Sequence, residues 1–161
     1  MATRATLLPF AAEFPATNFP ALTLSNRRPV LAYDTTTSET AYWTMIAPAG
    51  ITGTWTAVIS YAMASATSGG VAFDIAVEAI SSGDALDTDA TTSFDSVNAG
   101  NDSAVPGTAG YMEQISITLT NMDSVAAADY LRISVARDVA DAADTATGDC
   151  YVFAVEIRDA A

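Results

Sequence analysis

The sequence predicts an all-β protein, an eight-strand antiparallel jelly-roll sandwich preceded by an extended N-terminal arm. From Pro29 onward, short runs of residues are separated by turn residues, and within the runs apolar side chains recur at every second position. Strands with one apolar and one polar face are typical of antiparallel sheets, and eight of them in two stacked sheets form a jelly roll. We therefore divide the chain into an arm, residues 1–28, and a jelly-roll domain, residues 29–161.

Eight runs fit the pattern of strands. They span 29–34, 39–46, 53–63, 70–80, 92–98, 110–120, 129–138 and 149–159. The alternation in five of them predicts one core that contains Trp55, Phe73, Ile117, Ile133 and Phe153. A single short helical turn is expected between 121 and 128, where Asn121 can act as the cap.

The arm lacks this alternation. Phe-Pro-Ala occurs twice, and each proline holds the preceding residue extended and removes a backbone donor, which predicts neither a helix nor a central strand. Phe14, Pro15, Phe19 and Pro20 are therefore our candidate interface residues. The arm either covers an edge of its own sandwich or packs on a neighbouring subunit. Because all eight runs follow Arg28, we expect the sandwich to fold without the arm.

The composition excludes several classes of function. There are 19 Asp and Glu residues against six Arg, and the net charge of -13 disfavours a nucleic-acid partner. No apolar stretch approaches the ~20 residues that cross a bilayer, and Pro9 and Glu13 interrupt the short apolar run near the start, which argues against a signal peptide. The single cysteine, Cys150, cannot form an internal disulfide, which fits a reducing compartment. We expect a soluble protein with neither nucleic-acid nor membrane partners.

Residues for catalysis are scarce. The chain has no His and no Lys, which removes the usual general base, most transition-metal sites and Schiff-base chemistry. Cys150 follows Asp149, whose charge should raise the pKa of the thiol. Asp74 and Glu78 are an acid/base candidate pair, but they fall on the polar face of one strand, where solvated carboxylates are the commoner explanation. We therefore expect no enzyme, no catalytic residue and no cofactor.

Three aspartates, Asp138, Asp141 and Asp144, lead into the last run at a spacing of three. In a helix they would stack like charges on one face, and the spacing of an EF-hand is absent. We expect a hairpin link between the last two strands that binds no metal, with calcium shared with the loop at 34–39 as the alternative. A second acidic cluster, at 84–89, should lie at the opposite end of the sandwich.

Four aromatic residues, Tyr42, Trp43, Trp55 and Tyr61, suggest a sugar-binding platform of the kind found on jelly-roll carbohydrate modules. Trp55 and Tyr61 share the apolar face of their strand, so we expect both in the core. The strand of Tyr42 and Trp43 is apolar on both sides, and one of these two residues is expected to be exposed, either as a platform or in an interface.

The chain resembles a group of small virion proteins encoded by tailed bacteriophages. The resemblance covers nearly the whole chain and lies in the order and texture of four segments, 5–22, 27–48, 60–80 and 131–159, rather than in a catalytic motif. It implies a jelly-roll structural protein, such as a capsid decoration (cement) protein or a tail component, which is usually a homo-oligomer. It carries over no catalytic residue.

From this resemblance we expect a capsid decoration protein that is assembled in the host cytoplasm and resides on the capsid surface of the virion. We expect a homotrimer that bridges major capsid proteins by burying apolar surface across their junctions. The alternative is a carbohydrate-binding or receptor-binding module of a tail fibre that uses exposed aromatic side chains.

Overall fold

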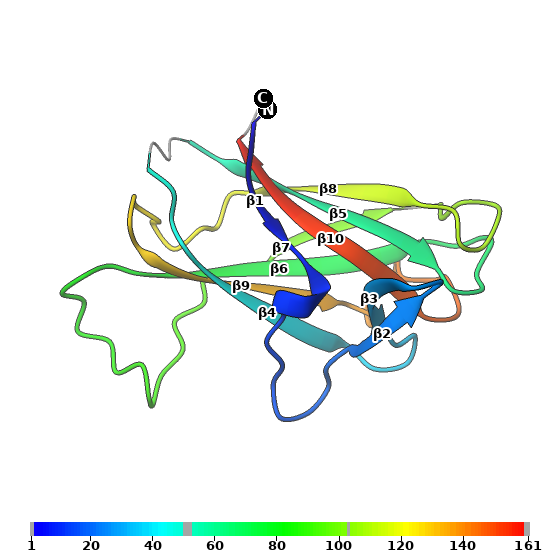
Figure 1. Ribbon diagram of the computed structural model, residues 1–161, viewed down its shortest axis with the longest axis horizontal. Coiled ribbons are helices and arrows are strands. Elements are labelled where there is room, and N and C mark those ends of the chain that lie inside the picture. The colour runs from blue at the N-terminus through cyan, green and yellow to red at the C-terminus, as the bar shows by residue number, and fades with distance from the viewer. Residues whose placement is uncertain (1, 50–52, 103, 160–161) are drawn as a thin grey trace.

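The computed structural model describes residues 2–49, 53–102 and 104–159, and it is an antiparallel two-sheet sandwich (Figure 1). The strands are β1 (Thr3–Leu7), β2 (Ala21–Ser25), β3 (Arg28–Tyr33), β4 (Glu39–Ile46), β5 (Trp55–Met63), β6 (Val71–Ile80), β7 (Asn98–Asp102), β8 (Glu113–Leu119), β9 (Tyr130–Arg137) and β10 (Cys150–Asp159). A single-turn 3-10 helix, η1 (Pro9–Ala11), follows β1.

The strand order is that of a jelly roll. One sheet has the order β2-β3-β10-β5-β8, with β1 also paired to β10, and the other has the order β4-β9-β6-β7. Seven of the strands β3 to β10 coincide with predicted runs, β7 follows the run predicted at 92–98, and the eight strands are interleaved between the two sheets. The predicted all-β jelly-roll sandwich is confirmed.

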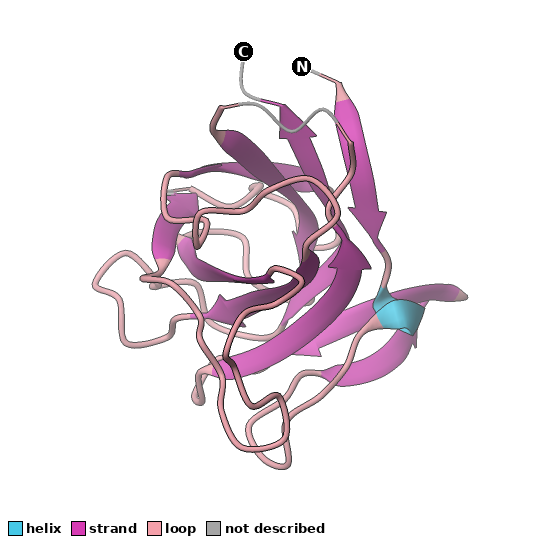
Figure 2. Cartoon of the chain, turned by 90° about the vertical axis from the view of Figure 1, so that its left-hand side faces the viewer, coloured by secondary structure: helices cyan, strands magenta, loops and turns pink. Residues whose placement is uncertain are grey.

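The arm contributes two strands to this sandwich, β1 and β2, which its sequence pattern did not predict. Strand β1 pairs with β10 and strand β2 pairs with β3. Both strands are free of proline, and Pro9, Pro15 and Pro20 all lie in the connection between them. Figure 2 shows the short helix at the side of the strands, where the arm joins the sandwich. Leu7 reaches the core of the sandwich.

The fifth strand lies later in the chain than predicted. The run at 92–98 is largely loop, and β7 instead has the sequence NAGND. Its Gly100 lies against the facing sheet, because a Cβ atom there would come within 2.5 Å of Ile117 Cγ1. A glycine in a strand marks such a close approach, and a run of Asn, Gly and Asp has no strand propensity of its own.

The core contains four of the five predicted residues. Trp55, Phe73, Ile117 and Ile133 are buried between the sheets, whereas Phe153 is half-buried and lies outside this cluster. The reason is a register shift in β10 between Val152 and Ala154, which changes the face that later residues occupy. Val155 and Ile157 face the core after the shift, as the alternation predicts, but before the shift Cys150 and Val152 face it in place of Tyr151 and Phe153.

No helical turn forms at 121–128. Asp123, Ser124 and Ala128 have φ values of 52°, 55° and 71°, in the left-handed region that a right-handed helix does not use. Asn121 does not cap a helix, and its side chain donates to the Val97 carbonyl. In the part of the chain that the structure describes, no helix is long and apolar enough for a membrane span.

Candidate functional site

The four candidate interface residues lie on the connection between β1 and β2. The rings of Phe14 and Phe19 contact one another at a centroid distance of 5.6 Å, and they remain 38% and 43% exposed. Pro15 is half-buried and Pro20 is buried. Each Phe ring thus shields part of the other from solvent, and both rings remain accessible to a partner.

Backbone hydrogen bonds attach this connection to the sandwich of the same chain. Glu13 N donates to Tyr42 O at 2.8 Å, Tyr42 N donates to Glu13 O at 2.9 Å, and Thr40 N donates to Asn18 O at 2.9 Å. The arm therefore covers the free edge of β4, which is the first of the two arrangements that the sequence left open.

The arm also carries much of the exposed apolar surface. Among the described residues, six of the eleven large apolar side chains that are exposed come from residues 8–24. We call this set the arm surface, and it consists of Leu8, Phe10, Phe14, Phe19, Leu22 and Leu24. Its Leu22 and Leu24 lie on β2, which is an edge strand.

Only one of the four aromatic candidates faces outward. Trp55 and Tyr61 are fully buried, as expected, and Trp43 is 2% exposed with its indole N–H donating to Leu8 O at 2.9 Å. Tyr42, the next residue along β4, points to the opposite face and is half-buried. Trp43 is therefore excluded as a platform, and Tyr42 remains.

On the outer face of the β4-β9-β6-β7 sheet, Tyr42 forms an aromatic pair. Its register neighbours across the sheet are the small residues Ser134 on β9 and Ala76 on β6. Phe94, from the loop that follows β6, stacks on Tyr42 with a centroid distance of 5.8 Å and an interplanar angle of 28°. The guanidinium of Arg132 lies over both rings, 5.0 Å from the centroid of Tyr42 and 5.4 Å from that of Phe94.

The next cross-strand row contains an ion pair. Arg132 on β9 lies opposite Glu78 on β6, and Arg132 Nη1 is 3.4 Å from Glu78 Oε2. The Glu78 side chain is almost completely buried, and its Oε1 accepts hydrogen bonds from the backbone N–H and the hydroxyl of Ser93. Glu78 is thus held in place by a cation and two donors.

Asp74 lies on the same strand as Glu78 but in different surroundings. Partial burial raises its pKa above the ordinary value, and the carboxylates of Asp138 and Asp141 raise it further. Since Glu78 is bound by Arg132 and Ser93 whereas Asp74 faces like charges, the two carboxylates do not share a partner as an acid/base pair would.

An open hollow of about 330 Å³ adjoins the ion pair and is the candidate functional site. Its lining consists of Glu13, Glu78, Ile80, Thr88, Thr91, Tyr130 and Arg132. Tyr130 is 41% exposed and lies opposite Ile80 in the sheet register, so one side of the hollow is apolar. Glu13 comes from the arm, and Thr88 and Thr91 come from the loop between β6 and β7, drawn in green in Figure 1. The lining thus combines an aromatic face with several polar groups, as small-ligand sites do.

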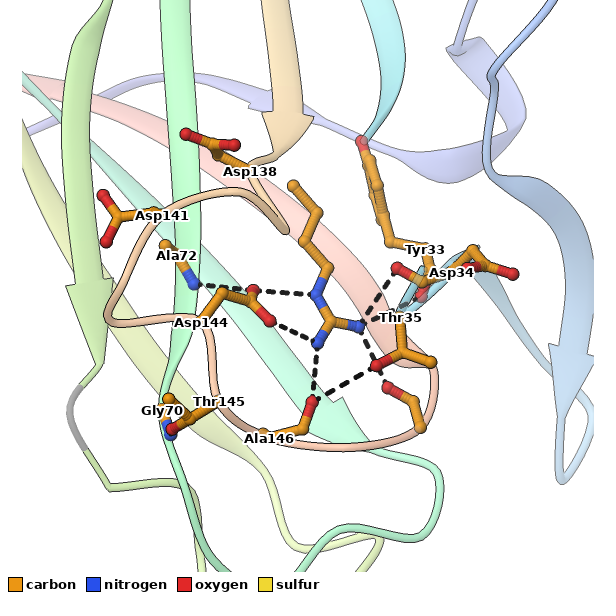
Figure 3. A network of polar contacts seen from close by, with 12 residues as sticks. Tyr33, Asp34, Thr35, Gly70, Ala72, Asp138, Asp141, Asp144, Thr145 and Ala146 are labelled. Atoms are coloured by element: carbon orange, nitrogen blue, oxygen red, sulfur yellow. Dashed lines mark hydrogen bonds and ion pairs between the residues drawn. The ribbon is translucent and has the colours of Figure 1, made fainter. Parts of the chain in front are cut away.

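The acidic segment before β10 is organised by one buried arginine. The guanidinium of Arg137 is fully buried and forms a two-point ion pair with Asp144 at 2.8 and 2.9 Å (Figure 3). It also donates to the carbonyls of Ala146 and Gly148, both at 2.9 Å, and to that of Asp34 at 3.3 Å. The loop at 34–39 is therefore a neighbour of this segment, and both are held by Arg137.

The segment is a crossing between sheets and not the predicted hairpin, because β9 and β10 belong to different sheets. Asp138 and Asp141 each accept a hydrogen bond from the backbone N–H two residues later, which makes them turn residues. Across the described part of the chain, no group of three or more Asp, Glu, Cys or His side chains is arranged to hold a metal ion.

The second acidic cluster also consists of turn residues. Asp84 accepts a hydrogen bond from the Ser81 N–H, and Asp87 accepts one from the Asp89 N–H. The cluster follows β6 and so lies at the end of the sandwich where β9 begins, opposite the 138–149 segment, as predicted.

Cys150 is a core residue. It is fully buried, and burial raises the pKa of its thiol, so the reactive thiolate is disfavoured.

Comparison with known proteins bears on the fold. No protein-family model matches the chain, and no curated protein sequence matches it. Among solved structures it is similar to the CBM22-1-GH10 modules of endo-1,4-beta-D-xylanase 10B from Clostridium thermocellum, complexed with xylohexaose, with a TM-score of 0.52 at 13% identity. That match covers 96% of this chain and 27% of the xylanase chain. The shared feature is the β-sandwich fold.

A second solved structure is a carbohydrate-binding module from Cellvibrio mixtus lichenase 5A in complex with cellotriose. Its TM-score is 0.47 at 12% identity, and the match covers 99% of this chain and 100% of that one.

Sequence reasoning missed most of the hollow. Of its lining, Glu78 was named as half of an acid/base pair, but Tyr130 and Arg132 were not named. The alternation within β9 could have identified Arg132. Its neighbours Leu131 and Ile133 point into the core, so Arg132 points to the outer face of the sheet.

Proposed function

We propose that this protein is a non-catalytic glycan-binding module whose ligand binds in the hollow on the outer face of the β4-β9-β6-β7 sheet. One observation carries the proposal, namely that an exposed aromatic ring, Tyr130, lies beside a fixed carboxylate–guanidinium pair, Glu78 and Arg132, in an open hollow.

A sugar ring requires these two kinds of contact. Its C–H face packs on an aromatic ring, and its hydroxyls exchange hydrogen bonds with carboxylates, guanidinium groups and hydroxyls. Tyr130 offers the ring, while Arg132 offers donors and the carboxylate of Glu13 offers acceptors. Thr88 and Thr91 add hydroxyls that both donate and accept.

The ion pair is already held in place before a ligand binds. Arg132 lies over Tyr42 and Phe94, and Ser93 fixes Glu78. Groups held in this way lose little side-chain freedom on binding, which favours affinity in a shallow site. The fold is compatible with this function, because the xylanase modules that it resembles were solved with a xylo-oligosaccharide.

The test is a screen of neutral oligosaccharides, with xylohexaose and cellohexaose as first probes, followed by titration calorimetry. Replacing Tyr130 with Ala should weaken binding by about tenfold or more, because the stacking face is lost. Tyr111→Ala is the matched control, since Tyr111 is 64% exposed and is not part of the hollow lining. If no oligosaccharide binds, neutral or acidic, or if both variants lose binding equally, the proposal fails.

Within a phage virion, such a module fits the receptor-binding part of a tail fibre, which is the second function that the sequence resemblance suggests.

A second candidate function is that of a capsid decoration protein, and the arm surface favours it. Six exposed apolar side chains within residues 8–24 are an unusual concentration, and exposed apolar surface commonly marks a protein–protein interface. In this candidate function the arm surface, with Phe14 and Phe19, contacts major capsid protein or another subunit of a homotrimer.

Copy number distinguishes the two functions. Mass spectrometry of purified virions should find hundreds of copies of a shell protein but only a few copies of a fibre component. Sedimentation of the purified protein tests the trimer, and Phe14→Ala with Phe19→Ala should weaken its assembly if the arm surface is the interface. A monomer without affinity for capsids would remove this candidate.

A further inference from the structure

We infer that the hollow selects neutral glycans and rejects glycans that carry carboxylate or sulfate groups. This inference rests on the proposed function and adds the chemical class of the ligand.

The charges that line the hollow do not favour an anion. Two carboxylates, Glu13 and Glu78, and one guanidinium, Arg132, leave the lining with one net negative charge. Glu13 is held at this position because both its backbone N–H and its carbonyl bond to Tyr42 on β4. A ligand that carries a carboxylate is therefore repelled by the Glu13 carboxylate, because the backbone of Glu13 is fixed and the residue stays at the hollow.

Arg132 is not available as a free cation. Its Nη1 atom is paired with Glu78 at 3.4 Å, and its guanidinium carbon lies 5.0 and 5.4 Å from the ring centroids of Tyr42 and Phe94. An acidic sugar that recruited Arg132 would leave Glu78, which is almost fully buried, without its cation. A buried carboxylate without a partner is strongly unfavourable, so this exchange is opposed. Arg132 can still donate its remaining N–H groups to neutral hydroxyls.

The wider surroundings add to the negative potential. The loop that provides Thr88 and Thr91 also carries Asp84, Asp87, Asp89 and Asp95. The chain as a whole has a net charge of -13. At an ionic strength of about 0.1 M, charges act over roughly 10 Å, so these aspartates contribute at the hollow mainly in dilute salt.

The test compares two probes that differ only at C6, a β-1,4-linked mannose hexamer and the β-1,4-linked mannuronate hexamer. The neutral hexamer should bind at least about tenfold more tightly in dilute salt, and the difference should shrink in 0.5 M NaCl because the repulsion is screened. The same comparison with cellohexaose and the corresponding glucuronate hexamer shows whether the preference for the neutral ligand holds for a second sugar.

A variant identifies the source of the selectivity. Glu13→Gln removes one lining carboxylate and should reduce the preference for the neutral hexamer by several-fold. Glu113→Gln makes the same change of charge on β8, in the opposite sheet, and should leave the preference unchanged.

The outcomes separate this inference from the proposed function. If a uronate hexamer binds as tightly as its neutral partner or more tightly, the inference is overturned while glycan binding stands. If neither kind of hexamer binds, the proposed function fails and the inference fails with it. If Glu13→Gln and Glu113→Gln have equal effects, the selectivity does not arise in the hollow, and the inference is likewise overturned.

Discussion

Arg137 and Asp144 are the residues on which the acidic end of the sandwich depends. The guanidinium and carboxylate are both almost inaccessible to solvent, and each has further partners, since Asp144 also accepts from the Ala72 N–H and Arg137 also donates to several carbonyls. Such a pair contributes little relative to an apolar replacement of both residues, but the loss of one member leaves a buried charge uncompensated. Asp144 therefore holds the acidic segment to β6 and to Arg137.

Arg137→Met should destabilise the protein by about 3–5 kcal/mol, because it takes the guanidinium away from the buried Asp144 carboxylate and from the carbonyls of Asp34, Ala146 and Gly148. Urea denaturation measures this change directly. Arg4→Met is the control, because the Arg4–Asp159 pair is solvent-exposed and such pairs contribute little to stability. Equal midpoints for the two variants would show that the Arg137 network is not structural.

Asp74 makes stability depend on pH. Partial burial, and then the charges of Asp138 and Asp141, raise the pKa of this carboxyl above its ordinary value. Since the folded state binds this proton more tightly than the unfolded state, ionised Asp74 lowers stability at neutral pH. That loss disappears as the pH falls through the raised folded-state pKa.

Asp74→Asn should therefore raise the thermal midpoint at pH 7 by about 1–2 °C, and the gain should vanish near pH 4. Thermal melts across this pH range measure the effect. Asp89→Asn, in the loop at the other end, controls for the change in net charge. If Asp89→Asn gives the same gain, overall charge and not the local environment of Asp74 is responsible.

At the scale of elements, the arm is both a part of the fold and a carrier of exposed apolar surface. Strand β1 pairs with β10, Leu7 is in the core, and the Leu8 carbonyl accepts the only hydrogen bond of the buried Trp43 indole in the described structure. That the sandwich folds without residues 1–28 stays a prediction, and these contacts argue against it. Phe14 and Phe19, whose rings contact one another, belong to the arm surface that remains accessible to a partner.

Leu7→Ala should cost about 2–4 kcal/mol, because it removes buried apolar contacts and leaves a cavity. Phe14→Ala combined with Phe19→Ala should cost less than Leu7→Ala, because both rings are already well exposed. Urea denaturation of the purified variants compares the two. If the double Phe variant were the less stable one, the phenylalanines would belong to the core of their own chain and not to an assembly surface.

The sequence predicted most strands because they alternate regularly, and it failed where local patterns do not determine the fold. Strand β10 contains a bulge that moves Phe153 out of the core, and nothing in the alternation of CYVFAVEIRD announces it. Strand β7 consists of Asn, Ala, Gly and Asp, and it forms because its backbone pairs with β6. Strands β1 and β2 were not predicted, because three prolines lie between these two short segments and prolines argue against strands.

At the scale of the whole molecule, the hollow could not be predicted because its residues are distant in sequence. Glu13, Glu78, Thr91 and Tyr130 come from the arm, from β6, from the loop after it and from β9. Only the pairing of β9 between β4 and β6, together with the attachment of the arm to β4, brings them to one face. The alternation of apolar residues states which side chains face outward but not which strands are neighbours.

The molecule has two candidate binding surfaces, the hollow and the arm surface. Finding which of them contacts a glycan tests the proposed function. The most direct measurement is an NMR titration of the labelled protein with the neutral oligosaccharide that binds best in the screen. Glycan binding in the hollow predicts that the amide shifts change most at Thr88, Thr91, Tyr130 and Arg132, and that the signals of Phe14, Leu22 and Leu24 stay in place. Shifts confined to the arm surface, or no shifts at all, would contradict it.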